Sequence, residues 1–208
     1  MDNVNRYEWL TRFGKCYGTT FKKNISDIKK ELKIFDDKWV KYNPRKDIPR
    51  YGLSVTSLDG NMTGRPDLDS FKEVYKETGH LYSEMDFVVK TPVYEIFKDI
   101  LNPFGEHLGR THVIKHKRGG MFPPHRDLTA KYPETFRMFL PIKGCNPPVN
   151  YFILDNKILN FDHGNLYFID TAKEHTVMTP GSESIFLVAN IRLCTEAIDV
   201  VLDNLAIH

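Results

Sequence analysis

Residues 109–127 read GRTHVIKHKRGGMFPPHRD, and this stretch decides how the second half of the chain is interpreted. One β-rich run ends at the Gly119-Gly120 turn, and a second, shorter run leads into His125 and Asp127. Similar runs, separated by Gly, Pro, Asn and Asp, continue almost to the C-terminus; the predicted strands are 110–117, 121–126, 136–142, 149–154, 157–161, 165–170 and 183–192. Short strands with frequent turn signals predict a sandwich or a jelly-roll barrel, and they argue against a parallel α/β sheet.

Helical patterns lie on both sides of this β-rich part. Residues 26–36 place Ile28, Leu32 and Phe35 on one face of a predicted helix. Thr91-Pro92 opens a second amphipathic helix, which ends near Asn102-Pro103. Residues 51–58 alternate as a strand, and Thr195 is predicted to cap a final helix.

These segments predict a mainly β protein with flanking helices around a jelly-roll, cupin-like core. A length of 208 residues is compatible with one domain, 1–208. Within it, a mixed and mostly helical part (1–105) is expected to pack on the jelly-roll core (109–193), and a helix is expected at 195–206.

The composition limits the class of partner. The chain has 29 Lys and Arg against 27 Asp and Glu, a formal net charge of +2, so charge gives no reason to expect nucleic acid or an anionic membrane. No apolar stretch is long enough to span a membrane and the first residues do not resemble a signal peptide, so we expect an intracellular, cytoplasmic protein. Cys16, Cys145 and Cys194 are widely spaced, which predicts reduced, buried thiols and no structural zinc site.

The residues that carry chemistry begin with His125 and Asp127. They are two positions apart, so on an extended strand their side chains project from the same face and a metal could bridge them. His175 follows the predicted strand at 165–170 and is the third candidate ligand. Two imidazoles and one carboxylate form the facial triad of Fe(II) oxygenases, which leaves coordination sites open for cosubstrate and oxygen. The alternative is a hydrogen-bonded surface pair, with His175 a histidine at the edge of the core.

Basic residues near this site are candidate anion-binding residues. Arg137 opens a strand on which Phe139 shares its face, and an arginine pointing into a barrel would be costly without an anion to pair with. A surface arginine is the alternative. On the strand before the metal loop, His112 and His116 alternate with Lys115 and Lys117, so one pair points inward and the other outward. The alternation alone leaves open which pair does so.

The run from Arg110 to Ile191 resembles the aspartyl/asparaginyl β-hydroxylase-like group of 2-oxoglutarate-dependent oxygenases. The first matching feature is a Gly-x-x-x-Pro-x-His motif that ends at His125. The others are the pair Arg137-Met138 at the start of the next strand, residues 141–145, and residues 164–170, which lead to His175. The resemblance implies a double-stranded β-helix that holds Fe(II) on His125, Asp127 and His175. It also implies that 2-oxoglutarate and molecular oxygen are consumed while an amino acid, free or within a peptide, is hydroxylated.

One position departs from that group. There, a basic residue on the strand after the second histidine pairs with the distal carboxylate of 2-oxoglutarate, and this chain has Ser184-Ile185 in its place. Arg137 is therefore the best candidate to bind an anion, either the cosubstrate or a substrate carboxylate. Lys117 and Arg192 are the reserve candidates, although a change of parity points Arg192 to the opposite face of its strand.

Two other functions are compatible with the same residues. The absence of the basic residue near Ile185 would suit a cupin-like metal-binding protein without oxygenase activity. Two histidines and one aspartate can also hold zinc, which would suit a zinc-dependent, non-oxidative enzyme.

Overall fold

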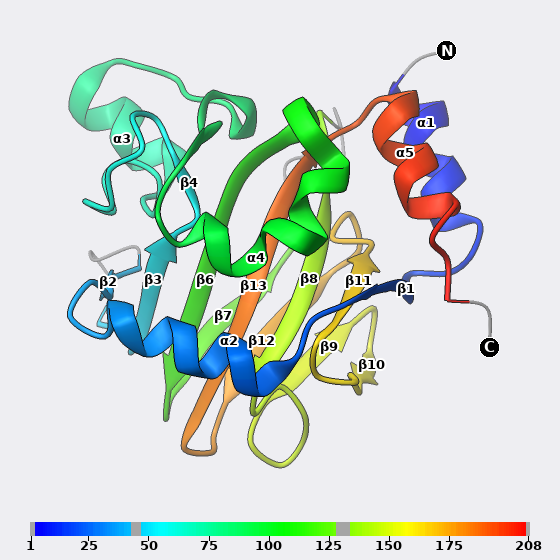
Figure 1. Cartoon of the computed structure of the whole chain (residues 1–208). Coiled ribbons are helices and arrows are strands. Elements are labelled where there is room, and N and C mark those ends of the chain that lie inside the picture. The colour runs from blue at the N-terminus through cyan, green and yellow to red at the C-terminus, as the bar shows by residue number, and fades with distance from the viewer. Residues whose placement is uncertain (1–2, 43–46, 128–133, 207–208) are drawn as a thin grey trace.

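The computed structural model describes residues 3–42, 47–127 and 134–206 (Figure 1). In this part of the chain, seven strands form the larger of two facing sheets, in the order β1-β11-β8-β13-β6-β3-β2. Their bounds are β1 (Cys16–Lys22), β2 (Val40–Lys41), β3 (Arg50–Ser54), β6 (Leu108–Lys117), β8 (Thr135–Lys143), β11 (Asn165–Ile169) and β13 (Glu183–Arg192).

Four strands form the smaller sheet, in the order β10-β9-β12-β7. Their bounds are β7 (Gly120–His125), β9 (Tyr151–Leu154), β10 (Lys157–Leu159) and β12 (His175–Thr179). A separate ribbon pairs β4 (Thr56–Ser57) with β5 (Val89–Lys90). From β6 to β13 the chain passes back and forth between the two sheets, with the β9–β10 hairpin in the smaller one. This arrangement is the predicted jelly roll, so the predicted fold class is confirmed.

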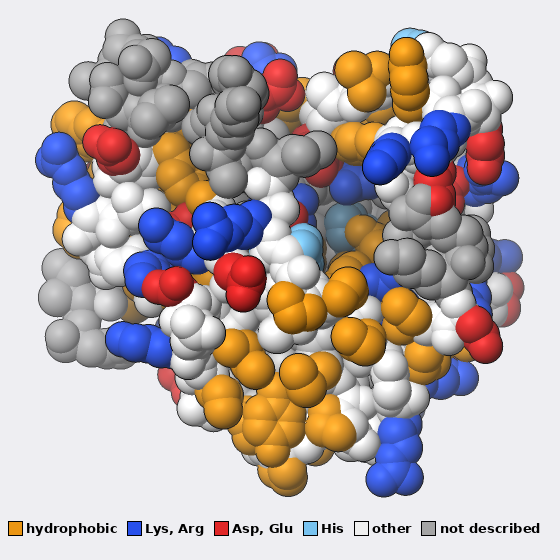
Figure 2. All heavy atoms as spheres, turned by 180° about the vertical axis from the view of Figure 1, so that it is seen from behind, with side chains coloured by type: hydrophobic (Ala, Val, Ile, Leu, Met, Phe, Trp, Pro, Cys, Tyr) orange, Lys and Arg blue, Asp and Glu red, His pale blue; other side chains and the backbone are white. Residues whose placement is uncertain are grey.

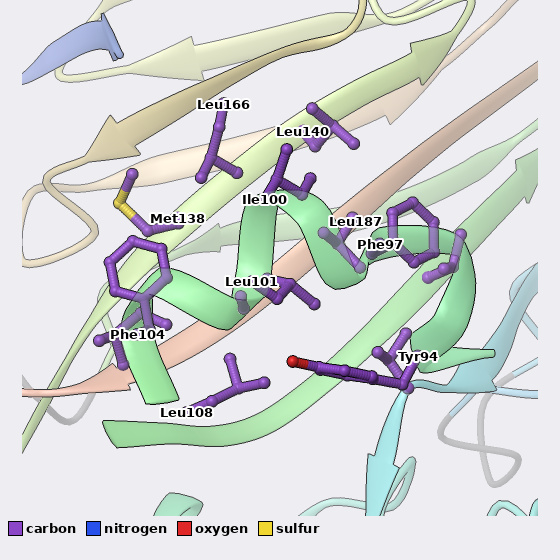
Figure 3. Packing of buried hydrophobic residues seen from close by; sticks show 14 of the residues in the cluster. Tyr94, Phe97, Ile100, Leu101, Phe104, Leu108, Met138, Leu140, Leu166 and Leu187 are labelled. Carbon is purple, nitrogen blue, oxygen red and sulfur yellow. The ribbon is translucent and has the colours of Figure 1, made fainter. Parts of the chain in front are cut away.

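Helices α2 (Ile25–Leu32) and α4 (Tyr94–Leu101) lie across the outer face of the larger sheet, and α1 (Asn3–Thr11) and α5 (Thr195–Leu202) pack against each other at one end of it. Helix α3 (Phe71–Thr78) lies apart from this layer, near β4. Short 3₁₀ turns occupy Lys33–Phe35, Glu84–Asp86 and Asn102–His107. Helix α4 lies against strands β8 and β13, and its apolar face meets theirs; the side chains in contact include Phe97, Ile100, Leu101, Met138, Leu140 and Leu187 (Figure 3). No helix among the described residues is long and apolar enough to cross a membrane.

The N-terminal part differs from the prediction for 1–105. Besides packing on the core, it contributes strands to the larger sheet itself. Strand β1 pairs with β11 at one edge of this sheet, and β3 pairs with β6 near the other edge. The predicted strand at 51–58 is divided after Ser54, where Val55 donates to the carbonyl of Thr111 and the chain turns into β4.

The C-terminal helix is shorter than the predicted 195–206. Cys194 is its N-cap residue, without a side-chain cap, so the predicted capping role of Thr195 is wrong. After Leu202 the chain turns toward β1, where Asn204 accepts a hydrogen bond from the Thr20 amide and Leu205 bridges to Thr19. All three cysteines are free thiols, but only Cys145 is fully buried.

Strand β6 decides which pair of basic side chains faces the interior. His116 lies between the sheets, with its ring centroid 5.2 Å from that of Phe122 and 5.3 Å from that of Phe186. Lys117, on the opposite face, is exposed and its Nζ lies 5.2 Å from the ring centroid of Tyr51. The histidines therefore point inward and the lysines outward.

His116 gives the fold an expected sensitivity to acid. Burial, with a smaller contribution from Arg50, lowers the pKa of His116 from 6.5 to about 3. Between these values the unfolded chain binds a proton that the folded chain excludes, so the free energy of unfolding falls as the pH falls through this window. The shift corresponds to roughly 5 kcal/mol. His116→Asn, which can retain a polar atom near Nδ1, is expected to make the pH profile shallower in urea unfolding measured between about pH 7 and 4. An equally steep profile in the variant would contradict this expectation.

Candidate metal centre

His125, Asp127 and His175 converge at the mouth of the space between the sheets. One ligand atom from each lies within 4.8 Å of the others. His125 at the end of β7 pairs directly with His175 at the start of β12, and their ring centroids are 4.2 Å apart. Nε2 of His125 is 3.7 Å from Oδ1 of Asp127. The structure thus brings together the three residues that the sequence singled out.

The turn before β7 aligns this strand with its neighbour. Gly119 has φ +84°, a left-handed conformation that costs glycine little. Gly120 follows it, and a Cβ there would lie 2.7 Å from Cβ of His116. Two successive glycines therefore let the chain reverse tightly and send β7 toward His125.

Backbone carbonyls fix both imidazole rings. Nδ1 of His125 is 2.7 Å from the Pro123 carbonyl oxygen, and Nδ1 of His175 is 3.0 Å from that of Lys173. A carbonyl oxygen only accepts hydrogen bonds, so each Nδ1 carries the proton and each neutral ring keeps a lone pair on Nε2. Hydrogen bonds of this kind orient histidine ligands in metal sites. The donor set and its orientation fit a divalent transition metal.

The loop from Asp170 to Glu174 holds two of the three candidate ligands. The Thr171 carbonyl accepts the amide of Asp127 at 3.1 Å, and the Lys173 carbonyl accepts Nδ1–H of His175. Helix α1 reaches the same loop, because the buried hydroxyl of Tyr7 donates to Oδ1 of Asp170 at 3.0 Å. The N-terminal helix therefore helps to position the site.

Arg137 determines the charge state of Asp127. Its Nε lies 3.1 Å from Oδ2 of Asp127, and its Nη2 is 3.7 Å from Oε1 of Glu84. Burial raises the pKa of Asp127, but the Arg137 charge, with His175 and Thr171, lowers it by more, so the net pKa lies below its usual range. The carboxylate is therefore ionised at neutral pH, as a metal ligand requires. Burial lowers the pKa of His175, which keeps this imidazole neutral.

A second arginine secures Glu84. Nε and Nη2 of Arg110 donate to the two carboxylate oxygens of Glu84 at 2.6 and 3.0 Å, and Nη1 donates to the carbonyls of Asp67 and Asp69. A bidentate pair of this type is strong and directional. Arg110, Glu84, Arg137 and Asp127 thus form an alternating chain of charges that ends at the candidate metal ligands.

A cavity of about 220 Å³ extends from these ligands into the space between the sheets. Its wall combines apolar residues, such as Ile114, Phe139 and Phe186, with the polar residues Tyr42 and His112. Nδ1 of His112 is buried and has no hydrogen-bond partner among the described residues. A cavity with few polar groups and a mainly apolar wall is typical of a small-molecule site.

The cavity continues outward into a wider groove, which we call the outer groove, of about 1230 Å³. Arg110, Asp127 and Arg137 line both spaces. Helix α3 and the segment after it form one wall; their lining residues include Phe71, Tyr75, Leu81, Tyr82 and Glu84. Figure 2 shows a hollow near the centre of the view, with histidine side chains in pale blue at its base.

The remaining predicted site residues lie apart from the cavity. Lys117 is exposed on the outer face of β6, and Arg192 is exposed at the end of β13; neither lines the cavity. Among the predicted anion-binding residues, only Arg137 does. Sequence reasoning missed Tyr42 and Glu84, because they come from segments without a recognisable motif. It also missed the inward orientation of His112, because the sequence left open which face of its strand points into the protein.

A second group of possible metal donors lies near the start of α5. His107, Cys194 and Glu196 have ligand atoms within 4.8 Å of one another, and Sγ of Cys194 is 3.5 Å from Nδ1 of His107. Burial raises the pKa of the Cys194 thiol. This group lines neither the cavity nor the outer groove.

Comparison with known proteins shows the fold. No family model matches the sequence, and no curated protein does. Among solved structures, HygX from Streptomyces hygroscopicus, determined with nickel, 2-oxoglutarate and hygromycin B bound, has a TM-score of 0.52 at 6% identity, covering 89% of this chain and 85% of HygX. A Pseudomonas putida prolyl-4-hydroxylase has a TM-score of 0.49 at 12% identity, covering 92% and 98%. A 2OG-Fe(II) oxygenase family oxidoreductase from Burkholderia pseudomallei has a TM-score of 0.42 at 13% identity, covering 83% and 92%. The likeness to HygX shows that this chain has the jelly-roll fold seen in 2-oxoglutarate-dependent oxygenases.

Proposed function

We propose that this protein is an Fe(II)- and 2-oxoglutarate-dependent oxygenase that hydroxylates an amino acid, free or within a peptide. The observation that carries the proposal is the convergence of His125, Asp127 and His175 with both Nδ1 atoms held by carbonyls. Two imidazoles and one carboxylate suit a non-haem Fe(II) site with open coordination positions. The resemblance of residues 110–191 favours the aspartyl/asparaginyl β-hydroxylase-like group.

The residues of the chain have distinct tasks in this proposal. His125, Asp127 and His175 would hold the iron, which together with 2-oxoglutarate supplies the activation of molecular oxygen. Arg137 keeps Asp127 ionised and offers positive charge to a carboxylate of the cosubstrate or of the substrate. The apolar wall of the cavity excludes water from the reacting groups. The outer groove gives an amino acid or a peptide segment a route to the metal.

The test is anaerobic addition of Fe(II) and 2-oxoglutarate, followed by oxygen. We expect a weak visible charge-transfer band from the chelate, and then formation of succinate when oxygen is admitted. A zinc-dependent enzyme would hold its metal without this band, and a cupin-like binding protein would show neither the band nor consumption of 2-oxoglutarate. Either result would reject the proposed function.

A further inference from the structure

A polar row crosses three adjacent strands of the larger sheet behind the apolar lining of the cavity. Arg50 on β3 pairs with His116 on β6, and His116 pairs with Ser184 on β13. Directly opposed residues in antiparallel strands project from the same face, so all three side chains point into the space between the sheets. Arg50 is 3% exposed, and His116 and Ser184 are completely buried.

The resembling group has its basic residue at the place that Ser184 and Ile185 occupy here, and of these two only Ser184 faces the space between the sheets, because Ile185 packs in the cluster under the helices. Ser184 cannot supply a charge, and its hydroxyl already bonds with Thr179 and Asn150. Arg50 starts from the same row two strands away, so a long side chain from β3 can reach the same region of the cavity. The sequence gives no hint of this, because Arg50 is far from every motif residue.

The guanidinium of Arg50 lies next to the cavity wall. Its Cζ is 4.3 Å from the ring centroid of Phe122 and 5.6 Å from that of Tyr42. Both rings line the cavity, whereas Arg50 lies behind them. Nε2 of His116, beside Phe122, is buried without a hydrogen-bond partner among the described residues. This side of the cavity therefore has a buried cation and a polar nitrogen close to its wall.

Arg137 is placed for a different anion. It contacts Asp127 and Glu84, and it lines both the cavity and the outer groove. It therefore faces the side from which a substrate would enter. Arg50 is the buried cation next to the Phe122 side of the cavity wall, and a carboxylate that enters a water-poor cavity needs such a partner.

We propose that Arg50 binds the distal carboxylate of the cosubstrate and takes over the task of the basic residue that this chain lacks at Ser184-Ile185. This inference rests on the proposed function, because it assigns one end of 2-oxoglutarate. It also requires the Phe122 ring to turn aside when the carboxylate enters. Arg137 then remains available for a carboxylate of the substrate.

The test compares two 2-oxo acids in anaerobic titrations of the Fe(II) protein, with the charge-transfer band as the readout. The probes are 2-oxoglutarate and 2-oxopentanoate, which has a methyl group in place of the distal carboxylate and keeps the chelating end. The wild-type protein is expected to prefer 2-oxoglutarate by at least about tenfold, or roughly 1.4 kcal/mol. Arg50→Met and Arg50→Gln should lose most of this preference and leave the affinity for 2-oxopentanoate nearly unchanged. Lys117→Met removes an exposed cation from the neighbouring strand and should retain the preference.

Each outcome discriminates between the two proposals. If the wild-type protein gives no band with 2-oxoglutarate, the proposed function fails. If it binds 2-oxoglutarate and an Arg50 variant retains the wild-type preference, the assignment of Arg50 fails while the function stands.

Circular dichroism shows which variants are folded. Arg50→Gln preserves more polar contacts than Arg50→Met and serves if the methionine variant does not fold. Arg50→Lys keeps the charge and is expected to retain part of the preference, so wild-type affinity in Arg50→Gln or complete loss in a folded Arg50→Lys would overturn the assignment.

Discussion

Alanine at His175 or at Asp127 is expected to abolish oxygen-dependent consumption of 2-oxoglutarate while leaving folded protein. Loss of an outer hydrogen-bond partner of a metal ligand costs roughly 10–100-fold in metal affinity or activity, and loss of a direct ligand should cost more. The two variants should differ in stability, because Asp127 also pairs with the partly buried Arg137. His175→Ala is therefore the cleaner test, and iron content and succinate formation are the measurements.

His80→Ala is a suitable control, because this exposed histidine lines neither the cavity nor the outer groove. It should bind iron and turn over as the wild-type protein does. Iron binding that persists at wild-type affinity in both His175→Ala and Asp127→Ala would contradict the ligand assignment. Loss of folded protein in both would instead support a structural role for these residues.

Arg137→Met is expected to weaken the affinity for 2-oxoglutarate, or for the acidic end of the substrate, by at least about tenfold, equivalent to roughly 1.4 kcal/mol. Methionine keeps much of the length of the side chain and removes the charge. The effect should be large because Arg137 lies where the cavity meets the outer groove, and charge-assisted pairs gain strength away from water. Separate titrations with cosubstrate and substrate would show which anion is affected.

Lys117→Met and Arg192→Met provide matched controls for the loss of one positive charge. Both residues are exposed and lie outside the cavity. The affinities of both variants for 2-oxoglutarate and for the substrate should stay within about twofold of the wild-type values, since exposed charges interact weakly through water. Unchanged affinity for both ligands in Arg137→Met would reject an anion-binding role for Arg137.

The β-core could be predicted from the sequence because its strands are short and end at clear turn residues. Strand β12 was missed, although His175–Thr179 contains two threonines and a valine, because it is short and follows the polar Lys173-Glu174 pair. Strand β1 was missed because Gly18 and two threonines interrupt any apolar alternation. Its pairing with β11 depends on contacts that are distant in sequence, and local patterns do not encode them.

There is a physical reason why the sequence could not predict which face of β6 points between the sheets. Alternation identifies the buried face of a strand only when the other face meets water. In β6 both faces are buried, with Val113 in the cluster under the helices and Ile114 in the cluster between the sheets. His125 and Asp127 were accessible to sequence reasoning because their i, i+2 spacing puts both side chains on one face of an extended chain, although Asp127 lies just beyond the end of β7. His175 was accessible because it follows a clear strand pattern at 165–170.

The placement of β1 and β3 at opposite sides of the larger sheet has a consequence for how the protein is made. Strand β1 leaves the ribosome well before its partner β11, and β13, which follows later still, must insert between β6 and β8. Pairings across such long separations carry a large loop-closure cost and fold slowly. Nascent chains that end before β13 would therefore lack the central strand of the larger sheet and leave β6 and β8 with open edges, which are sites for intermolecular pairing.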